Sequence, residues 1–519
     1  MPEQDYWKLI TGKSFKSSTW IPSFDDVLEE QWLGLHSKYR LRTLGYFEGG
    51  AVRITEEQRP HIHIIGSTQE GKSKFIEYLI RGDIKRGIGC CLIDPTTGGK
   101  TVYDVLKYCA YKKIKKVCLI DPYHRKEYNT VAGITPFLYT SEGFKSDYLK
   151  ETSVKDFQDT THVLFNVKEE SSQMRIERYL PSVLNILYDA KAPLCDVQYF
   201  TNRIFKHQRE KLLETADNAS KLDIEEVFNS FSAFSAFQST INRMMRFFKG
   251  TIGLMFSPEK TVDFRKMVSE GWVILVNLDS GLGFDNLDSR LLGTFIINQI
   301  TTSIERLNKK GFYKPFYLYI DEASRYANRK LADTLSLKQK TGLKVTLAHQ
   351  YAEQFEDKYV FDSILANCKI TAMFNVKMTK DRDLISKQFY GGDINPLDAS
   401  YNNSDLPTQH AIIKPLKGKP VRVMIPTVKD APVSKDELND YVKALYLRDA
   451  WYHNAKELKE TNDRTIPTNT KSPQSRKVDD PETDSQTAIP RPIQRKLEKG
   501  IRPDNKKPPE PPKKRPIKI

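Results

Sequence analysis

The chain has 519 residues and a formal net charge of +15, and 39% of its residues are hydrophobic. This composition excludes a wholly disordered chain and leaves room for two or three domains. No apolar run approaches the 18 residues of a membrane-spanning helix, and the start, MPEQDYWKLI, is not a secretory signal. We therefore expect a cytoplasmic protein with a polyanionic partner, which other proteins could hold at the inner face of a membrane.

The first part of the chain divides into an extension and the start of an α/β domain. Residues 1–55 have mixed polarity and form an N-terminal extension of unclear structure. Over 56–150, short apolar segments alternate with helical patterns, and two of these segments end in Asp-Pro. Short buried strands that alternate with helices are typical of a parallel sheet.

A phosphate-binding pattern, G-x-x-x-x-G-K-[ST], occupies residues 66–73 between a strand pattern and a helix pattern. The backbone N–H groups of such a loop and the helix N-terminus after it attract phosphate. We expect Lys72 to contact the β- and γ-phosphates of ATP and Ser73 to bind Mg²⁺. Glu70 is unusual, because it places a carboxylate beside the phosphates. The expected nucleotide-binding residues are Gly66, Ser67, Thr68, Gln69, Glu70, Gly71, Lys72 and Ser73.

Residues 151–262 contain long helical patterns and few strand signals, which predicts an all-helical insertion. The clearest stretches are 174–190 and 224–248. The second stretch is rich in phenylalanine, which favours a helical core over a surface that stacks on DNA bases. These residues are Phe228, Phe231, Phe234, Phe237, Phe247 and Phe248.

The α/β pattern returns over 263–452, and the apolar segment 316–320 ends in Asp321-Glu322. A buried strand that ends in this pair is typical of the second half of an ATPase site, although such a pair also caps helices. Asp321 would organise the Mg²⁺ shell, and Glu322 would polarise the attacking water. Gln350 follows the next strand, where its amide can contact the γ-phosphate or the water as a sensor.

The C-terminal segment 453–519 loses periodicity, and Pro, Lys, Asn and Thr dominate it. Residues 491–519 hold 11 Lys/Arg and 3 Asp/Glu, so the other 490 residues carry a net charge of only +7. We expect a disordered basic tail. The six cysteines have no C-x-x-C spacing, which favours buried thiols over a metal site or disulfides.

The segments GSTQEGKS, YLYIDEASRYAN, TGLKVTLAHQ and ILANCKITAMFNVKMTKDRDLISKQF together resemble the HerA/FtsK superfamily of ring ATPases. Within it, the chain looks most similar to conjugative coupling proteins of type IV secretion, the TraG/TraD-like group, over roughly residues 55–430. The resemblance implies a RecA-like P-loop NTPase with a mostly parallel sheet and an inserted helical domain. It also implies a homo-hexamer that hydrolyses ATP with Mg²⁺ to move DNA, and relaxase, secretion-channel and membrane-anchor proteins as partners.

The sequence departs from that family in two respects. Coupling proteins usually begin with membrane-spanning helices, and no such helix is expected here. They also usually carry an Arg-Lys pair before the sensor strand, where this chain has Lys338-Gln339-Lys340. We expect Lys340 to supply the charge that acts on the next subunit's nucleotide, with Lys338, Arg325 and Arg382 as alternatives. A DNA-processing or packaging motor and a non-motor NTP-binding scaffold are the alternative functions.

Overall fold

The computed structural model describes residues 41–47, 50–55, 59–137, 146–165, 170–244, 249–279, 284–312, 314–337, 342–390, 406–416 and 419–464. The chain divides into two units, Met1–Pro467 and Thr468–Ile519, and every described residue lies in the first. The expected basic tail beyond residue 464 therefore lies outside the described residues. Among the helices that are described, none is long and apolar enough to cross a membrane.

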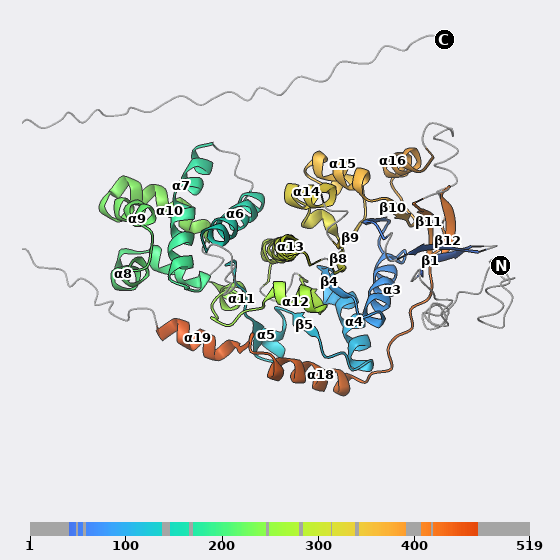
Figure 1. Cartoon of the computed structure of the whole chain (residues 1–519), viewed down its shortest axis with the longest axis horizontal. Coiled ribbons are helices and arrows are strands. Elements are labelled where there is room, and N and C mark those ends of the chain that lie inside the picture. Colours follow the sequence, from blue (N-terminus) through green and yellow to red (C-terminus); the bar gives the residue numbers. More distant parts are fainter. Residues whose placement is uncertain are drawn as a thin grey trace, which may run out of the picture. The chain divides into compact units, whose positions relative to one another are not determined.

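Within the described residues, eleven strands form one mixed sheet (Figure 1). Seven parallel strands lie in the order β10-β3-β9-β8-β4-β7-β5, and the antiparallel strands β11, β12, β1 and β2 extend the sheet beyond β10. The predicted mostly parallel α/β fold is confirmed. The strands are β1 (Leu41–Phe47), β2 (Gly50–Thr55), β3 (Ile62–Ile65), β4 (Gly89–Asp94), β5 (Val117–Ile120), β7 (Val273–Asn277), β8 (Phe316–Ile320), β9 (Leu343–His349), β10 (Ile370–Met373), β11 (His410–Lys414) and β12 (Val421–Met424).

Two hydrophobic cores cover the two faces of the sheet, because successive side chains of a strand point to opposite sides. In β4, Cys90 and Leu92 belong to one core, and Cys91 and Ile93 belong to the other. The first core includes α3 (Lys72–Lys85), α4 (Lys100–Tyr111) and α18 (Lys435–Arg448). The second includes α12 (Phe264–Glu270), α13 (Asn286–Lys309), α14 (Arg329–Leu337) and α15 (Lys358–Asn367). All six cysteines are buried and free, as the sequence predicts.

In chain order, a block of helices follows β5 and precedes β7 (Figure 1). The helical stretch predicted over 224–248 consists of two helices as far as residue 244, because Ser230 has an extended backbone and separates α9 from α10. Phe237 is fully buried and Phe228 and Phe234 pack on the same core, whereas Phe231 is exposed. Phe247 and Phe248 lie outside the described residues. The helices are α6 (Ser146–Phe165), α7 (Glu170–Asp189), α8 (Lys206–Leu213), α9 (Asn218–Asn229), α10 (Phe231–Met244) and α11 (Gly250–Met255).

Two expected boundaries differ from the structure. The N-terminal extension expected over 1–55 contains β1 and β2, which pair with each other and, through β1, with β12. The tail expected from residue 453 begins with ordered structure, because β13 (Tyr452–Asn454) pairs with β6 (Thr130–Ala132) and α19 (Ala455–Arg464) follows it. Local periodicity in these short segments is weak, and pairing with strands distant in sequence stabilises them.

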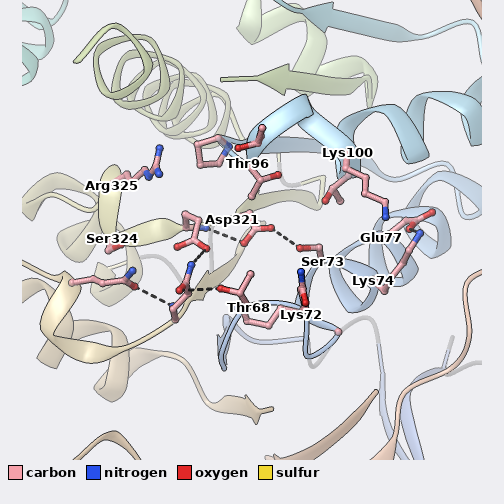
Figure 2. Close-up of a pocket in the computed structure, with 18 of the residues that line it drawn as sticks. Thr68, Lys72, Ser73, Lys74, Glu77, Thr96, Lys100, Asp321, Ser324 and Arg325 are labelled. Carbon is pink, nitrogen blue, oxygen red and sulfur yellow. Dashed lines mark hydrogen bonds and ion pairs between the residues drawn. The ribbon is translucent and has the colours of Figure 1, made fainter. Parts of the chain in front are cut away.

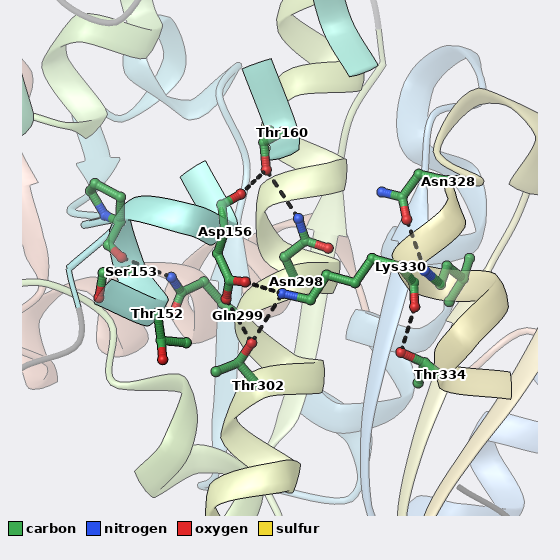
Figure 3. Close-up of polar contacts among 12 residues, drawn as sticks. Thr152, Ser153, Asp156, Thr160, Asn298, Gln299, Thr302, Asn328, Lys330 and Thr334 are labelled. Carbon is green, nitrogen blue, oxygen red and sulfur yellow. Dashed lines mark hydrogen bonds and ion pairs between the residues drawn. The ribbon is translucent and has the colours of Figure 1, made fainter. Parts of the chain in front are cut away.

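A polar cluster joins α6 of the helical block to α13 and α14, which pack on the sheet (Figure 3). Lys330, in the first turn of α14, contacts Asp156 of α6 and Thr302 of α13. Thr302 Oγ1 also donates to Asp156 Oδ2 at 2.8 Å, and Asn298 Nδ2 donates to Thr160 Oγ1 at 3.0 Å. The helix that follows Asp321-Glu322 is therefore tied to the helical block by a largely buried ion pair.

We expect Lys330→Ala to lower the free energy of unfolding by about 1–3 kcal/mol, because the 13% exposed Asp156 loses its cation. Urea denaturation measures this loss. Arg178→Ala is the control, because Arg178 and Glu226 form a half-exposed pair whose loss should cost about 0–1 kcal/mol. Equal losses in the two variants would contradict a structural role for the Lys330 contact.

Candidate nucleotide-binding site

The segment 66–71 leaves β3 and turns directly into α3, as the sequence predicts. Gly66 N donates to His349 O at 3.3 Å, and Ser67 N donates to Asn375 O at 2.8 Å, which fixes the loop to the ends of β9 and β10. Gly71 has a φ of 112°, which a side chain would disfavour. A Cβ at Gly66 would lie 2.6 Å from Phe374 Cβ, so glycine is required at this close approach.

Lys72 and Ser73 begin α3 and lie at the floor of the site (Figure 2). Lys72 Nζ donates to the loop carbonyls of Gly66 at 2.5 Å and of Ser67 at 3.0 Å. Ser73 Oγ donates to Asp321 Oδ2 at 3.1 Å, across a separation of 248 residues. The two halves of the predicted ATPase site therefore meet in the folded chain.

A second set of contacts joins the ends of β8 and β9 to the phosphate loop (Figure 2). Gln350 Nε2 donates to Glu322 Oε1 at 2.7 Å, and Thr68 Oγ1 donates to Gln350 Oε1 at 3.2 Å. Glu322 holds a left-handed backbone conformation with a φ of 47°, which is uncommon for a residue with a side chain. The structure thus brings Thr68, Glu322 and Gln350 into one hydrogen-bonded group.

Burial and neighbouring charges shift the protonation of this site. Burial, together with the nearby Asp94 and Glu322 carboxylates, raises the pKa of Asp321 to about 7, and Lys72 acts in the opposite direction. Burial likewise raises the pKa of Asp94 and lowers the pKa of Lys72. A cation beside Asp321 would offset the repulsion among these carboxylates.

The residues present fit Mg²⁺. Ser73 supplies a hydroxyl oxygen and Asp321 a carboxylate oxygen, and oxygen atoms are the ligands that Mg²⁺ prefers. Mg²⁺ usually binds through one or two such protein ligands together with phosphate oxygens and water. Ser73 and Asp321 therefore provide as many protein ligands as a nucleotide-bound Mg²⁺ usually has.

Glu70 also contacts residues outside the segment 66–73. Asn375 Nδ2 lies 3.5 Å from Glu70 Oε1, and Gln409 N donates to Glu70 O at 3.2 Å. These contacts place Glu70 next to the segments that follow β10 and precede β11. Its carboxylate is therefore turned toward Asn375.

An open pocket of about 1050 Å³ surrounds the site and contains residues that the sequence motifs did not single out. Asp94 ends β4 and accepts hydrogen bonds from the backbone N–H groups of Thr96 at 2.8 Å and Thr101 at 3.2 Å. It thereby holds the segment 95–100, which contributes Pro95, Thr96, Thr97 and Lys100 to the pocket wall. The Asp94-Pro95 ending was a visible signal for a turn, but it did not indicate a nucleotide pocket. The additional lining residues include Thr96, Thr97, Lys100, Thr101, Asp104 and Arg290.

The side chains expected to supply a cation to the next subunit's nucleotide lie in different parts of the chain. Lys340, together with Lys338 and Gln339, lies outside the described residues. Arg325 is exposed and lines the pocket beside Ser324 (Figure 2). Arg382 lies on α16 (Thr379–Tyr390), where its guanidinium donates to Thr379 Oγ1 at 3.3 Å. The assignment of Lys340 stays a prediction.

A protein-family model matches the part of the chain that contains the second half of this site. Residues 315–410 match the family model described as the TraM recognition site of TraD and TraG. The chain is similar to TraG/TraD-like conjugative coupling proteins, as the sequence predicts. The matched segment contains Asp321, Glu322 and Gln350. No curated protein sequence matches the chain.

Solved structures resemble the whole coupling-protein-like fold. The bacterial conjugative coupling protein TrwBdeltaN70 in its unbound monoclinic form is 16% identical, with a TM-score of 0.53 over 82% of this chain and 97% of that chain. The plasmid coupling protein TrwB with ADP and Mg²⁺ is 15% identical, with a TM-score of 0.51 over 80% and 95%. VirB4 of Thermoanaerobacter pseudethanolicus is 14% identical, with a TM-score of 0.52 over 75% and 96%. At these identities the likeness shows a shared fold.

Proposed function

We propose that this chain is an ATP-hydrolysing motor that moves DNA to a conjugative type IV secretion channel, as coupling proteins do. The observation that carries the proposal is the meeting of Ser73 with Asp321 and of Thr68 with Gln350 and Glu322. A phosphate loop, an acidic pair and an amide from three separate strands converge on one pocket. These residues therefore place in one pocket the groups that can bind phosphate, polarise the attacking water and sense the γ-phosphate.

Each side chain has a distinct role in the proposed hydrolysis. Lys72 would exchange its loop carbonyls for the β- and γ-phosphate oxygens, and the loop N–H groups would hold the phosphates. Ser73 and Asp321 would hold Mg²⁺, which neutralises phosphate charge. Glu322 would accept a proton from the attacking water, and Gln350, bonded to Glu322, would orient that water. Loss of the γ-phosphate would then change the contacts of Gln350, which follows β9 and is hydrogen-bonded to Thr68 of the phosphate loop.

The solved relatives support the choice of ligand. One TrwB structure is a complex with ADP and Mg²⁺, and another is a complex with a non-hydrolysable ATP analogue. Both share the fold of this chain. We therefore propose ATP and Mg²⁺ as the ligands of this pocket.

The proposed polyanionic partner is DNA, and the proposed assembly is a homo-hexameric ring. A net charge of +15, more than half of it in residues 491–519, supports attraction to the phosphate backbone. The family match to the TraM recognition site supports an accessory protein of the DNA-processing complex as a further partner, with relaxase, channel and membrane-anchor proteins completing the machine.

The test is the steady-state rate of ATP hydrolysis by the full chain, measured alone and with single- or double-stranded DNA. We expect DNA of one kind to stimulate hydrolysis severalfold, because a motor couples its cycle to its track. Hydrolysis at the same rate with and without DNA would favour an NTPase of another kind. Tight ATP binding without turnover would favour the scaffold.

Deletion of 491–519 should weaken DNA binding, because it removes a net charge of +8. The loss should be largest at low salt and shrink as salt screens the remaining charges. DNA-binding isotherms at several salt concentrations measure it. A steep fall in melting temperature of the deletion variant would instead show that the segment contributes to folding.

A further inference from the structure

Five cationic side chains line the nucleotide pocket, and they differ in what already neutralises them. Lys74 Nζ lies 2.8 Å from Glu77 Oε2 and 2.9 Å from Asp104 Oδ2, so two carboxylates already neutralise its charge. Lys72 belongs to the phosphate loop, and Lys100 is exposed at the start of α4. Two arginines complete the set, Arg290 and Arg325.

The packing of α13 holds Arg290 near Asp321 and Glu322. The preceding residue, Ser289, donates to Leu278 O at 2.9 Å and lies 3.1 Å from the hydroxyl of Tyr326. Tyr326 follows Asp321-Glu322 by four residues. The start of α13 is therefore fixed beside the end of β8, and Arg290 is 31% exposed on the pocket wall.

The guanidinium of Arg290 has only a loose partner among the described residues. Its nearest carboxylate is that of Glu356 at 3.8 Å, which is longer than a hydrogen bond, and Glu356 is 77% exposed. Its Nε is buried and has no hydrogen-bond partner in the described part of the chain. An ion pair of this kind contributes little to stability, so a phosphate can replace it at small cost.

We propose that Arg290 binds the γ-phosphate of ATP in its own subunit and stabilises the negative charge that develops there during hydrolysis. This inference rests on the proposed ATPase function. A guanidinium offers phosphate two parallel N–H donors, which an ammonium group cannot do. Arg290 lies on the wall of its own subunit's pocket, so it can act there whether or not Lys340 acts on the nucleotide of the next subunit.

The first experiment compares nucleotide affinities of Arg290→Ala and Arg290→Lys by calorimetry with ADP and a non-hydrolysable ATP analogue. We expect Arg290→Ala to weaken analogue binding about tenfold and to leave ADP binding unchanged, because only the γ-phosphate is contacted. Arg290→Lys should fall between. Turnover of Arg290→Ala should drop on the order of 100-fold. Arg329→Ala, on an exposed arginine paired with Asp357, is the control and should match wild type.

The second experiment separates cis from trans action by mixing subunits. Arg290→Ala mixed with Lys72→Ala should recover no activity, because no subunit then has both its own Lys72 and its own Arg290. Lys340→Ala mixed with Lys72→Ala should recover part of the activity if Lys340 acts across the interface. Recovery in the Arg290 mixture would overturn the cis assignment.

The outcomes distinguish this inference from the proposed function. If wild type hydrolyses ATP and Arg290→Ala keeps both the turnover and the preference for the ATP analogue, the inference is wrong and the ATPase assignment stands. If wild type does not hydrolyse ATP, the proposed function fails. The affinity difference between the analogue and ADP still tests the Arg290 contact in that case. Unchanged melting temperatures would show that the variants are folded.

Discussion

Lys72→Ala should lose productive ATP binding, and Glu322→Gln should bind ATP but fail to hydrolyse it. Lys72 Nζ already contacts two loop carbonyls at the phosphate position, so its removal takes away the charge that faces the phosphates. Glu322→Gln keeps the shape of the site and removes only the base. We expect turnover to fall by at least about 100-fold in each variant. Equilibrium binding of ATP and steady-state hydrolysis, measured together, distinguish the two defects.

Lys377→Ala is a suitable control for this pair, because Lys377 is exposed and only its backbone N–H contacts the loop, at Ser67 Oγ. It should bind and hydrolyse ATP like wild type. If Lys72→Ala and Glu322→Gln both hydrolyse ATP at the wild-type rate, the pocket is not the site of hydrolysis.

Asp83→Ala should be the most destabilising substitution among the buried charges described here. Asp83 lies on α3 with no exposed surface, and it pairs with Arg42 of β1 and, at 3.1 Å, with Arg59. Removing its carboxylate takes an anion away from two buried guanidinium groups. Such a loss costs about 3–5 kcal/mol of unfolding free energy. Urea denaturation monitored by circular dichroism measures it.

Two further variants sharpen this test. Asp83→Asn keeps the volume but not the charge and should be nearly as unstable. Asp430→Ala removes a carboxylate that is 78% exposed and 3.8 Å from Lys74, so it should change stability by less than about 0.5 kcal/mol. A stable Asp83→Ala protein would show that β1 and Arg59 do not depend on this anion.

The central part of the fold could be predicted from the sequence because its signals are local. The strand before Gly66, the apolar segment before Asp321 and the segment before Gln350 each carry their own pattern. Their adjacency follows from parallel strands ending at one edge of a sheet. The contacts of Ser73 with Asp321 and of Gln350 with Glu322 agree with that predicted adjacency.

The rest depends on contacts that the sequence does not reveal. The sequence of strand β1 has mixed polarity and no clear pattern of its own. Its place in the sheet comes from pairing with β12, which lies nearly 380 residues later in the chain. Arg290 carries no motif, and it reaches the pocket only because Ser289 and Tyr326 fix α13 beside β8. Ser230 ends a helix that hydrophobic periodicity alone would continue. In each case long-range packing or a local backbone change decides the structure.

ATP-driven displacement of streptavidin from the biotinylated end of single- and double-stranded DNA tests the motor most directly. We expect the wild-type chain to displace streptavidin only with ATP and Mg²⁺, and Glu322→Gln to bind the same DNA without displacing it. Displacement should stop when a non-hydrolysable ATP analogue replaces ATP. DNA-stimulated hydrolysis without displacement on either kind of DNA, or displacement by Glu322→Gln at the wild-type rate, would contradict movement driven by this site.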